Sequence, residues 1–273
     1  MKIVLRDELH QLWKNKDPFE EVQGLKGFIV REKEGRQTLR FDLANKTYYR
    51  KLHRGIGWKE VWKNIFQGRM PIIGATNEWL AINRLHQLGI DSLNTVGFGK
   101  KGINPAKQLS FIITEELTNT ISLAKFAESW PTHPPSYTLK RALIEKVATI
   151  SRRIHENGIN HRDLYICHFL LDRSSALNPL KSSDIRLYLV DLHRAQIRSS
   201  VPCRWLVKDM ASLYFSSVDT GITARDVMRF LRIYFQSPIK NIFDQRKAFL
   251  LKVKKRATKL YLRDFGQLPQ FPL

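Results

Sequence analysis

The sequence is short of cysteine, of long apolar runs and of acidic residues, and each shortage excludes something. Its two cysteines, Cys167 and Cys203, are too few for a disulfide framework and too far apart for a zinc knuckle. No stretch approaches the roughly 18 consecutive apolar residues of a membrane span, and charged residues interrupt the first apolar run, unlike in a signal peptide. We therefore expect a cytoplasmic protein.

Acidic residues are outnumbered: 25 Asp and Glu stand against 46 Lys and Arg, a formal net charge of +21. Hydrophobic residues make up 43% of the chain, which is enough for a folded core and excludes a disordered basic tail. Three kinds of anion match this charge: nucleic acid, a glycolipid or membrane rich in phosphate, and an acidic protein or nucleotide. Charge alone does not choose between them.

The positive excess is densest near the end of the chain, where residues 221–264 carry twelve Lys and Arg against three Asp. Within it, the pattern over 245–264 predicts a basic amphipathic helix. Such a helix either presents a solvated face while packing on the protein or docks on a membrane surface. We favour the first interpretation from the pattern alone.

The first 117 residues predict a small lobe made mostly of sheet. Alternating residues and turn signals predict a three-stranded antiparallel meander, followed by a short helix with an apolar stripe, a stronger helix ended by Gly89, and a buried strand that runs into an acidic connector. The expected elements are strands 28–33, 38–43 and 47–53, helices 58–66 and 75–88, and strand 109–114.

The second half is predominantly helical. Apolar residues at helical spacing predict a long helix that ends before Gly158, and an irregular stretch and two short apolar runs precede further helices. These elements are helix 137–157, runs 169–171 and 185–190, and helices around 204–217, 222–235 and 241–264. We expect a two-lobed α+β protein, with residues 1–117 as the small lobe, 118–273 as the larger lobe and a cleft between them.

Two acidic residues of the second half carry the chemistry. Asp163 lies in the segment His161-Arg-Asp-Leu, and Asp191 follows an apolar run. One aspartate can orient and deprotonate a hydroxyl, and the other can hold Mg²⁺ through its oxygens. This pair suits phosphoryl transfer, in which positioning and charge neutralisation do most of the catalysis.

The order of further motifs resembles the protein-kinase-like superfamily. Lys51 lies on the third strand of the meander and Glu78 on the following helix, and His161-Arg-Asp-Leu and Asp191-Leu-His come later in the chain. The resemblance implies a two-lobed kinase fold in which Lys51 and Glu78 pair beside the phosphates of ATP. Arg50 is the alternative to Lys51. Gly35 in the first hairpin turn and Glu115 and Leu117 in the connector complete the expected ATP-binding residues.

The sequence departs from the kinase pattern in three respects. The first hairpin turn offers Gly35 alone, so the backbone amides from Glu34 to Gln37 would have to cover the phosphates. The second metal-binding Asn is replaced by His168, which we keep as a metal-site candidate although neutral imidazole is a poor ligand for Mg²⁺. No Ala-Pro-Glu triplet follows Asp191. A pseudokinase with a binding role alone stays open.

Longer strings narrow the resemblance. The segments His53-Arg-Gly-Ile-Gly-Trp, His161-Arg-Asp-Leu-Tyr-Ile-Cys-His-Phe-Leu and Asp191-Leu-His-Arg-Ala-Gln, with Arg204-Trp and the segment from Lys208 to Phe215, are similar to the lipopolysaccharide core heptose(I) kinases. The resemblance covers about residues 1 to 240. It implies transfer of the γ-phosphoryl group of ATP to a hydroxyl of the first inner-core heptose, at the cytoplasmic face of the inner membrane. Asp163, with Arg162 beside it, would be catalytic, Asp191 would bind Mg²⁺, and Asp209 would brace the catalytic loop.

The expected partners follow from charge and from the resemblance. The candidates for binding the acidic groups of a lipopolysaccharide core precursor are arginines near the motifs, because arginine matches phosphate and carboxylate bidentately. They are Arg54, Arg194 and Arg198, together with Arg162 and Arg204. Trp58 and Trp62 form either a core stripe, which we favour, or a platform for sugar or lipid. An acyl carrier protein is one candidate for an acidic partner.

Other function classes remain as alternatives at this point. A kinase of the same fold could act on protein tyrosine or a small sugar. A basic nucleic-acid-binding module is not expected, because the sequence has no zinc-finger spacing, RRM-like aromatic motif or heptad zipper.

Overall fold

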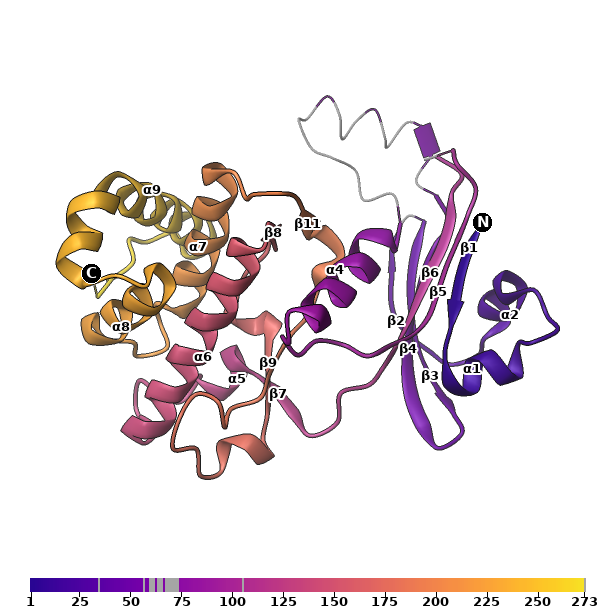
Figure 1. Cartoon of the computed structure of the whole chain (residues 1–273), viewed down its shortest axis with the longest axis horizontal. Coiled ribbons are helices and arrows are strands. Elements are labelled where there is room, and N and C mark those ends of the chain that lie inside the picture. The colour runs from indigo at the N-terminus through magenta and orange to yellow at the C-terminus, as the bar shows by residue number, and fades with distance from the viewer. Residues whose placement is uncertain are drawn as a thin grey trace. The chain divides into compact units, whose positions relative to one another are not determined.

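The computed structural model describes residues 1–33, 35–55, 57–58, 62, 66, 74–104 and 106–272. The chain forms two compact units, Met1–Arg84 with Leu93–Thr118, and Leu85–Ser92 with Asn119–Leu273 (Figure 1). Glu34, most of the helix expected over 58–66 and most of the loop expected before Gly74 lie outside the described residues. No helix in the described part of the chain is both long enough and apolar enough to span a membrane.

Unit 1 is built on a six-stranded antiparallel sheet whose strand order is β1-β5-β6-β4-β3-β2. The predicted meander is confirmed as its β2, β3 and β4 strands, and Ala44 and Asn45, both at positive φ, make the tight turn from β3 to β4. The strands are β1 (Lys2–Leu5), β2 (Phe28–Lys33), β3 (Arg36–Leu43), β4 (Lys46–His53), β5 (Thr95–Lys101) and β6 (Leu109–Glu115).

Helices cover both faces of this sheet (Figure 1). On one face, α1 (Asp7–Leu12) and α2 (Pro18–Gly24) supply buried side chains to a core with alternate residues of the strands, among them Leu39, Phe41 and Phe111. On the other face lies α4 (Thr76–Gln87), whose Trp79 stacks on Phe98 with ring centroids 4.4 Å apart. Gly89 follows α4 at a positive φ, as predicted.

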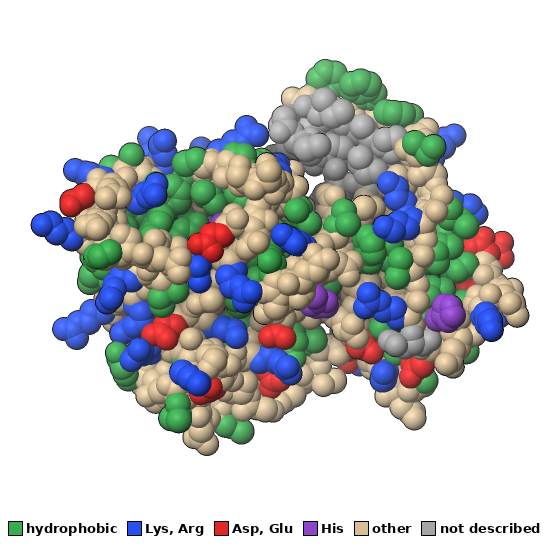
Figure 2. Space-filling view, in the orientation of Figure 1, with side chains coloured by type: hydrophobic (Ala, Val, Ile, Leu, Met, Phe, Trp, Pro, Cys, Tyr) green, Lys and Arg blue, Asp and Glu red, His purple; other side chains and the backbone are tan. Residues whose placement is uncertain are grey.

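Unit 2 is mainly helical. Its long helices are α6 (Tyr137–Glu156), α7 (Cys203–Ser217), α8 (Ala224–Phe235) and α9 (Ile239–Phe265), and α7, α8 and α9 share an apolar cluster. The predicted C-terminal helix is therefore packed through residues such as Val253 and Ala257, while Lys252, Lys255 and Lys259 are exposed. Lys and Arg side chains are spread over the visible face rather than gathered in one patch (Figure 2).

Short strands of unit 2 fix the loops between the helices. A three-stranded sheet has the order β10-β9-β7, and β8 pairs with β11. The remaining elements are β7 (Thr120–Ser122), α5 (Leu123–Phe126), β8 (Ile159–Asn160), η1 (Ile166–His168), β9 (Phe169–Asp172), η2 (Ser174–Ala176), β10 (Leu187–Leu189), η3 (Leu192–Arg194) and β11 (Gln196–Ile197).

The preference for a core stripe at Trp58 and Trp62 is wrong. Both indoles are about half exposed, and Phe66 is more exposed still. The three rings form a row, with centroids 6.5 and 6.0 Å apart. Helical spacing predicts an apolar stripe but does not say whether the stripe faces the core or the solvent.

Candidate active site

Lys51 and Glu78 form a close ion pair in unit 1. Lys51 Nζ lies 2.5 Å from Glu78 Oε1, and the side chains are 18% and 1% exposed. Lys51 is fixed in the middle of the sheet, opposite Thr38 on β3 and Ile112 on β6. Glu78 is buried, and its second carboxylate oxygen has no hydrogen-bond partner among the described residues. The close ion pair holds the Lys51 ammonium group at a defined place on this face of the sheet.

Arg50, the alternative to Lys51, points to the opposite face of the sheet because side chains alternate along a strand. It is 1% exposed, and its guanidinium donates to the Val22 carbonyl oxygen at 2.7 Å and to Gln37. Burial, together with Arg54, lowers the pKa of Arg50. Lys51 is therefore the residue that meets Glu78, and Arg50 has a structural role.

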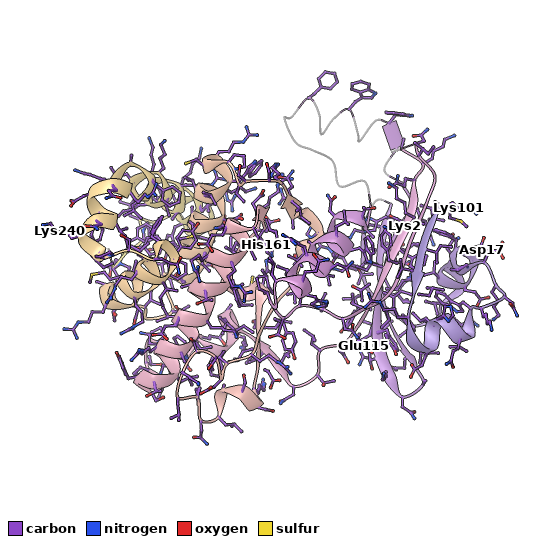
Figure 3. All side chains as sticks on the ribbon, viewed as in Figure 1. Lys2, Asp17, Lys101, Glu115, His161 and Lys240 are labelled. Carbon is purple, nitrogen blue, oxygen red and sulfur yellow. The ribbon has the colours of Figure 1, made fainter. Side chains whose placement is uncertain are left out.

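The other residues expected to bind ATP, Gly35, Glu115 and Leu117, also lie in unit 1. Gly35 is at a positive φ, and its carbonyl oxygen accepts from the Arg54 amide at 2.7 Å. Arg54 itself is exposed. Glu115 ends β6, where its carboxylate contacts Asn94 and lies 3.5 Å from Lys46 Nζ (Figure 3). Leu117 follows it in the chain, at partial exposure.

The catalytic-loop candidate Asp163 lies in unit 2 between β8 and β9. Its two carboxylate oxygens both accept from Arg194 NH1, each at 2.9 Å. Its backbone carbonyl oxygen lies 2.7 Å from His168 Nδ1. The guanidinium of Arg194 holds the Asp163 carboxylate in one orientation. An ionised, oriented carboxylate is what a general base requires.

Asp191, the expected metal ligand, is held between two histidines. Its φ is 60°, in the left-handed region, and its carboxylate contacts His193 Nδ1 at 2.5 Å and His168 Nε2 at 3.5 Å. One carboxylate that keeps about a third of its surface exposed fits Mg²⁺, which is commonly held by one or two carboxylates together with waters and substrate phosphates.

His168 suits a metal less well. Burial by itself lowers the pKa of His168, but Cys167, the Asp163 carbonyl and Asp191 outweigh burial and raise it to about 9. A protonated imidazole has no lone pair for a metal. Among the described residues, no group of three or more His, Cys, Asp and Glu side chains is placed to hold a metal ion.

Asp209 braces the loop from below. Its carboxylate is fully buried on α7 and accepts from the backbone amides of His161 and Arg162, at 2.7 and 2.8 Å. It also contacts His155 Nε2 at 3.3 Å, and His155 Nδ1 lies 2.7 Å from the Tyr234 hydroxyl. The burial of His161, labelled in Figure 3, lowers its pKa, so a neutral imidazole lies at the start of the loop.

Comparison with known proteins shows the family. Residues 20–234 match the lipopolysaccharide kinase (Kdo/WaaP) family. The chain belongs to this family. It is 46% identical over 270 residues, 98% of this chain and 100% of the relative, to the lipopolysaccharide core heptose(I) kinase WaaP of Pseudomonas aeruginosa. It is 48% identical over 258 residues, 94% of this chain and 96% of the relative, to the enzyme of that name from Escherichia coli.

A solved structure of WaaP in complex with acyl carrier protein is similar over almost the whole fold. The TM-score is 0.83 at 43% identity, and the match covers 96% of this chain and 100% of that one. This confirms the resemblance predicted from the sequence motifs. It also confirms the predicted α+β fold, with a sheet-rich N-terminal part and a helical C-terminal part.

The sequence alone did not predict that several cations gather around the indole of Trp205. The Arg162 guanidinium lies over the ring of Trp205 on α7, 4.9 Å from its centroid, and Lys208 lies 5.4 Å from it. Arg198, a substrate candidate, lies 6.0 Å from the same ring. The available signal was the helical spacing of Arg204, Trp205 and Lys208, which puts two cations next to one indole.

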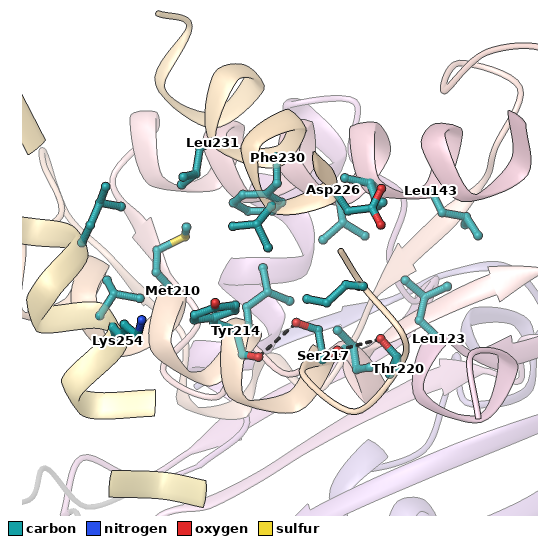
Figure 4. Close-up of a pocket in the computed structure, with 18 of the residues that line it drawn as sticks. Leu123, Leu143, Met210, Tyr214, Ser217, Thr220, Asp226, Phe230, Leu231 and Lys254 are labelled. Carbon is teal, nitrogen blue, oxygen red and sulfur yellow. Dashed lines mark hydrogen bonds between the residues drawn. The ribbon is translucent and has the colours of Figure 1, made fainter. Parts of the chain in front are cut away.

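A second feature without a sequence signal is an apolar cavity of about 320 Å³ in unit 2 (Figure 4). It is lined by residues of α5, α6, α7, α8 and α9. Residues that line it include Leu123, Leu143, Met210, Tyr214, Phe230 and Lys254. Its lining is predominantly hydrocarbon, as in pockets for apolar ligands.

Proposed function

We propose that this chain is a kinase that transfers the γ-phosphoryl group of ATP to a hydroxyl of the first heptose of the lipopolysaccharide inner core. Family membership and relatives of that activity over nearly the full chain support the reaction and its acceptor. The observation that carries the assignment to residues is the contact of Arg194 with both oxygens of Asp163, on a loop braced by Asp209.

Asp163 acts as the general base. Its carboxylate accepts the proton of the acceptor hydroxyl as the oxygen forms its bond to the γ-phosphorus and the bond to the leaving β-phosphate oxygen breaks. Arg194 keeps the carboxylate oriented before the acceptor arrives. His168, whose ring is within hydrogen-bonding distance of the Asp163 carbonyl, fixes the backbone at the same residue.

Lys51 binds the phosphates of ATP, and Glu78 holds its ammonium group in place. Gly35, Glu115 and Leu117 bind the nucleotide from the same unit. Asp191 would hold Mg²⁺, which would supply neutralisation of phosphate charge, and His193 orients the Asp191 carboxylate. His168 contacts Asp191 as a neighbour of the metal ligand.

Replacement of Asp163 tests this assignment. In Asp163→Asn, we expect unchanged ATP binding and a loss of phosphate transfer of about 10²-fold or more, because general-base catalysis contributes about that much. Wild-type enzyme and labelled ATP should be offered unphosphorylated core oligosaccharide, a tyrosine-containing peptide pool and simple sugars. Label on the peptides or sugars instead of the core, or retained activity in Asp163→Asn, would contradict the proposal.

We also propose an acylated acyl carrier protein as a partner. The similar WaaP structure contains an acyl carrier protein, and this chain combines an apolar cavity with Lys247 and Lys254 in its lining. The acyl chain would occupy the cavity, and the two lysines would attract the acidic carrier. The basic residues of α9 thus have a further use besides solvation.

The carrier proposal separates into two contributions. Lys247→Glu with Lys254→Glu should weaken binding of both acyl and unacylated carrier, measured by calorimetry, whereas Leu250→Trp, which fills the cavity, should weaken binding of the acyl form alone. Equal affinity of wild-type protein for the two carrier forms would exclude an acyl chain in the cavity.

Peripheral contact with the cytoplasmic face of the inner membrane is the remaining part of the proposal. The exposed lysines of α9, Lys252, Lys255 and Lys259, would lie against anionic lipid. Their replacement by Gln should reduce flotation with phosphatidylglycerol vesicles but not with phosphatidylcholine vesicles, and should leave ATP binding unchanged. Equal losses of ATP binding and flotation would contradict it.

A further inference from the structure

Four cations surround the indole of Trp205 in unit 2. The Arg162 and Arg204 guanidinium groups lie 4.9 and 5.4 Å from the ring centroid, Lys208 Nζ lies 5.4 Å from it and Arg198 lies 6.0 Å from it. An aromatic ring attracts a cation to its face. Because an indole has only two faces and no net charge, it cannot compensate four positive charges.

These cations lack carboxylate partners in the described part of the chain. No salt bridge joins Arg162, Arg198, Arg204 or Lys208 to an Asp or Glu among the described residues. The neighbouring Arg194, in contrast, forms a salt bridge with Asp163. Burial and Arg194 lower the pKa of Lys208 and of Arg162, and they outweigh the nearby Asp163 carboxylate, which raises both. The group therefore carries an excess of positive charge.

Two buried donors in the group have no acceptor. Arg162 is 8% exposed, and its Nε has no hydrogen-bond partner among the described residues. Trp205 Nε1 is also buried without an acceptor there. Buried donors are normally paired, and an unpaired one is costly. An anion that reached either donor would supply the missing acceptor.

The start of α7 adds to the same potential. The helix begins at Cys203 after Pro202, no side chain caps its first turn, and that turn has no acidic residue. Arg204 and Trp205 belong to this first turn. The positive end of the helix dipole favours an anion beside it.

Side-chain and backbone hydrogen bonds hold Arg198 in place. Arg198 NH1 donates to Asn160 Oδ1 at 2.5 Å, and NH2 donates to Gln196 at 2.7 Å. The Arg198 amide donates to the Gly158 carbonyl oxygen at 2.9 Å, next to the pairing of β11 with β8. Arg198 is thus preorganised rather than a freely moving surface arginine.

We propose that Arg162, Arg198, Arg204 and Lys208 around Trp205 form a binding site for an acidic group, carboxylate or phosphate, of the acceptor. The proposal rests on the proposed function, since the acceptor is an anionic glycolipid. Arg162 is the chain neighbour of Asp163, so an acidic group at this site lies in the part of the acceptor close to the reacting hydroxyl. The site makes acidic substitution a condition of acceptor recognition.

Steady-state kinetics with Arg204→Gln/Lys208→Gln tests the site. We expect the KM for core oligosaccharide to rise about tenfold or more, in line with the loss of charged hydrogen bonds, with kcat and the KM for ATP changed less than about twofold. Arg232→Gln, an exposed arginine of α8, is the matched control and should behave like wild type. An unchanged KM for the acceptor would overturn the proposal.

The source of the acidic group is separated by changing the acceptor. A lipopolysaccharide core precursor that still carries phosphate is compared, on wild type and on the double variant, with the same precursor after its carboxylates are reduced to alcohols and after its phosphate is removed. The modification that removes the KM difference between the two proteins identifies the group that binds. A KM difference that persists in an acceptor lacking both groups would contradict the assignment.

A binding measurement that needs no turnover separates this proposal from the kinase assignment. Protein containing 5-fluorotryptophan, with the Trp205 signal assigned from Trp205→Phe, is titrated with inorganic phosphate and with acetate. We expect a saturable shift of the Trp205 ¹⁹F signal in wild type and none in the double variant. Absence of the shift in wild type overturns the site even if the kinase activity stands. If the signal shifts but the protein does not phosphorylate core oligosaccharide, the anion-binding site is supported and its assignment to the acceptor is contradicted.

Discussion

Asp209 holds Arg162 in a left-handed backbone conformation. The Arg162 amide donates to Asp209 Oδ1 at 2.8 Å, and Arg162 has a φ of 73°. A residue with a side chain rarely adopts such a φ without compensation. The buried carboxylate supplies that compensation, and the same peptide segment presents Asp163 on one side and the Arg162 guanidinium to Trp205 on the other.

Replacing Asp209 should release the loop. In Asp209→Ala, the amides of His161 and Arg162 lose their buried acceptor, so we expect the free energy of unfolding to fall by about 3 kcal/mol. Hydrogen exchange at these two amides should accelerate before the protein unfolds globally. Asp264→Ala, at the exposed end of α9, is the control. Unchanged protection of both amides in Asp209→Ala would mean that the loop is held by other contacts.

The Lys51–Glu78 pair should behave as a buried couple in a double-mutant cycle. Lys51→Met leaves a buried, uncompensated Glu78 carboxylate, and we expect a loss of about 3 kcal/mol in stability. Adding Glu78→Gln should restore most of that loss, since the charge is then gone, while ATP binding stays impaired. Urea denaturation and nucleotide titration measure the two effects. Additive losses in the double variant would show that the residues are not coupled.

Gly158 should be far more sensitive to substitution than another glycine of similar φ. A Cβ on Gly158 would lie 1.8 Å from the Arg198 carbonyl oxygen, whereas a Cβ on Gly266 meets no atom within 4 Å, and φ is 74° and 69° at the two sites. Gly266→Ala should cost about 1 kcal/mol for the left-handed backbone, and Gly158→Ala clearly more. Thermal melts of the two variants give the difference. Equal costs would show that β11 moves aside freely.

Asp226 should contribute stability that acid removes. Burial would raise the pKa of Asp226, but hydrogen bonds from Lys140 and Thr223 outweigh burial and lower it below its ordinary value. A carboxyl with a lower pKa in the folded than in the unfolded state stabilises fully above the unfolded-state pKa of about 4, and loses this contribution as the pH falls through the folded-state pKa.

The comparison of wild type with Asp226→Asn isolates that contribution. We expect the wild type to melt at a higher temperature than the variant at pH 7, and the gap to close as the pH is lowered from about 5 to 3. Lys181→Gln, an exposed change outside the pair, should leave the profile unaltered. A gap that stays constant with pH would show that Asp226 acts through shape rather than charge.

The long amphipathic helices were predictable because periodicity and a terminal glycine act together, as at α6 before Gly158 and α4 before Gly89. The elements α1 and α2 were not, since six or seven residues are too few to show a period. Strand β5 was hidden by Gly97 and Gly99. The structure explains the second of these glycines, because a Cβ there would lie 2.3 Å from the Phe111 ring.

The pairing of Lys51 with Glu78 was predictable from motif order, and the side-chain alternation of a strand then decides between Lys51 and Arg50. The contacts around Asp163 and Asp191 were not. His193 binds Asp191 two residues away, whereas the next residue, Arg194, reaches Asp163. The cations around Trp205 come from three separate segments, so their convergence exists only in the folded chain.

The buried guanidinium of Arg50 ties the N-terminal residues to the folding of the sheet. Its donor NH1 ends on the carbonyl of Val22 in α2, 28 residues upstream, and a desolvated arginine without that acceptor is costly. Docking of α2 therefore completes the hydrogen bonding of the Arg50 side chain on β4. A chain shortened by its first two dozen residues would keep every motif residue of the site and still leave a positive charge stranded beneath Lys51.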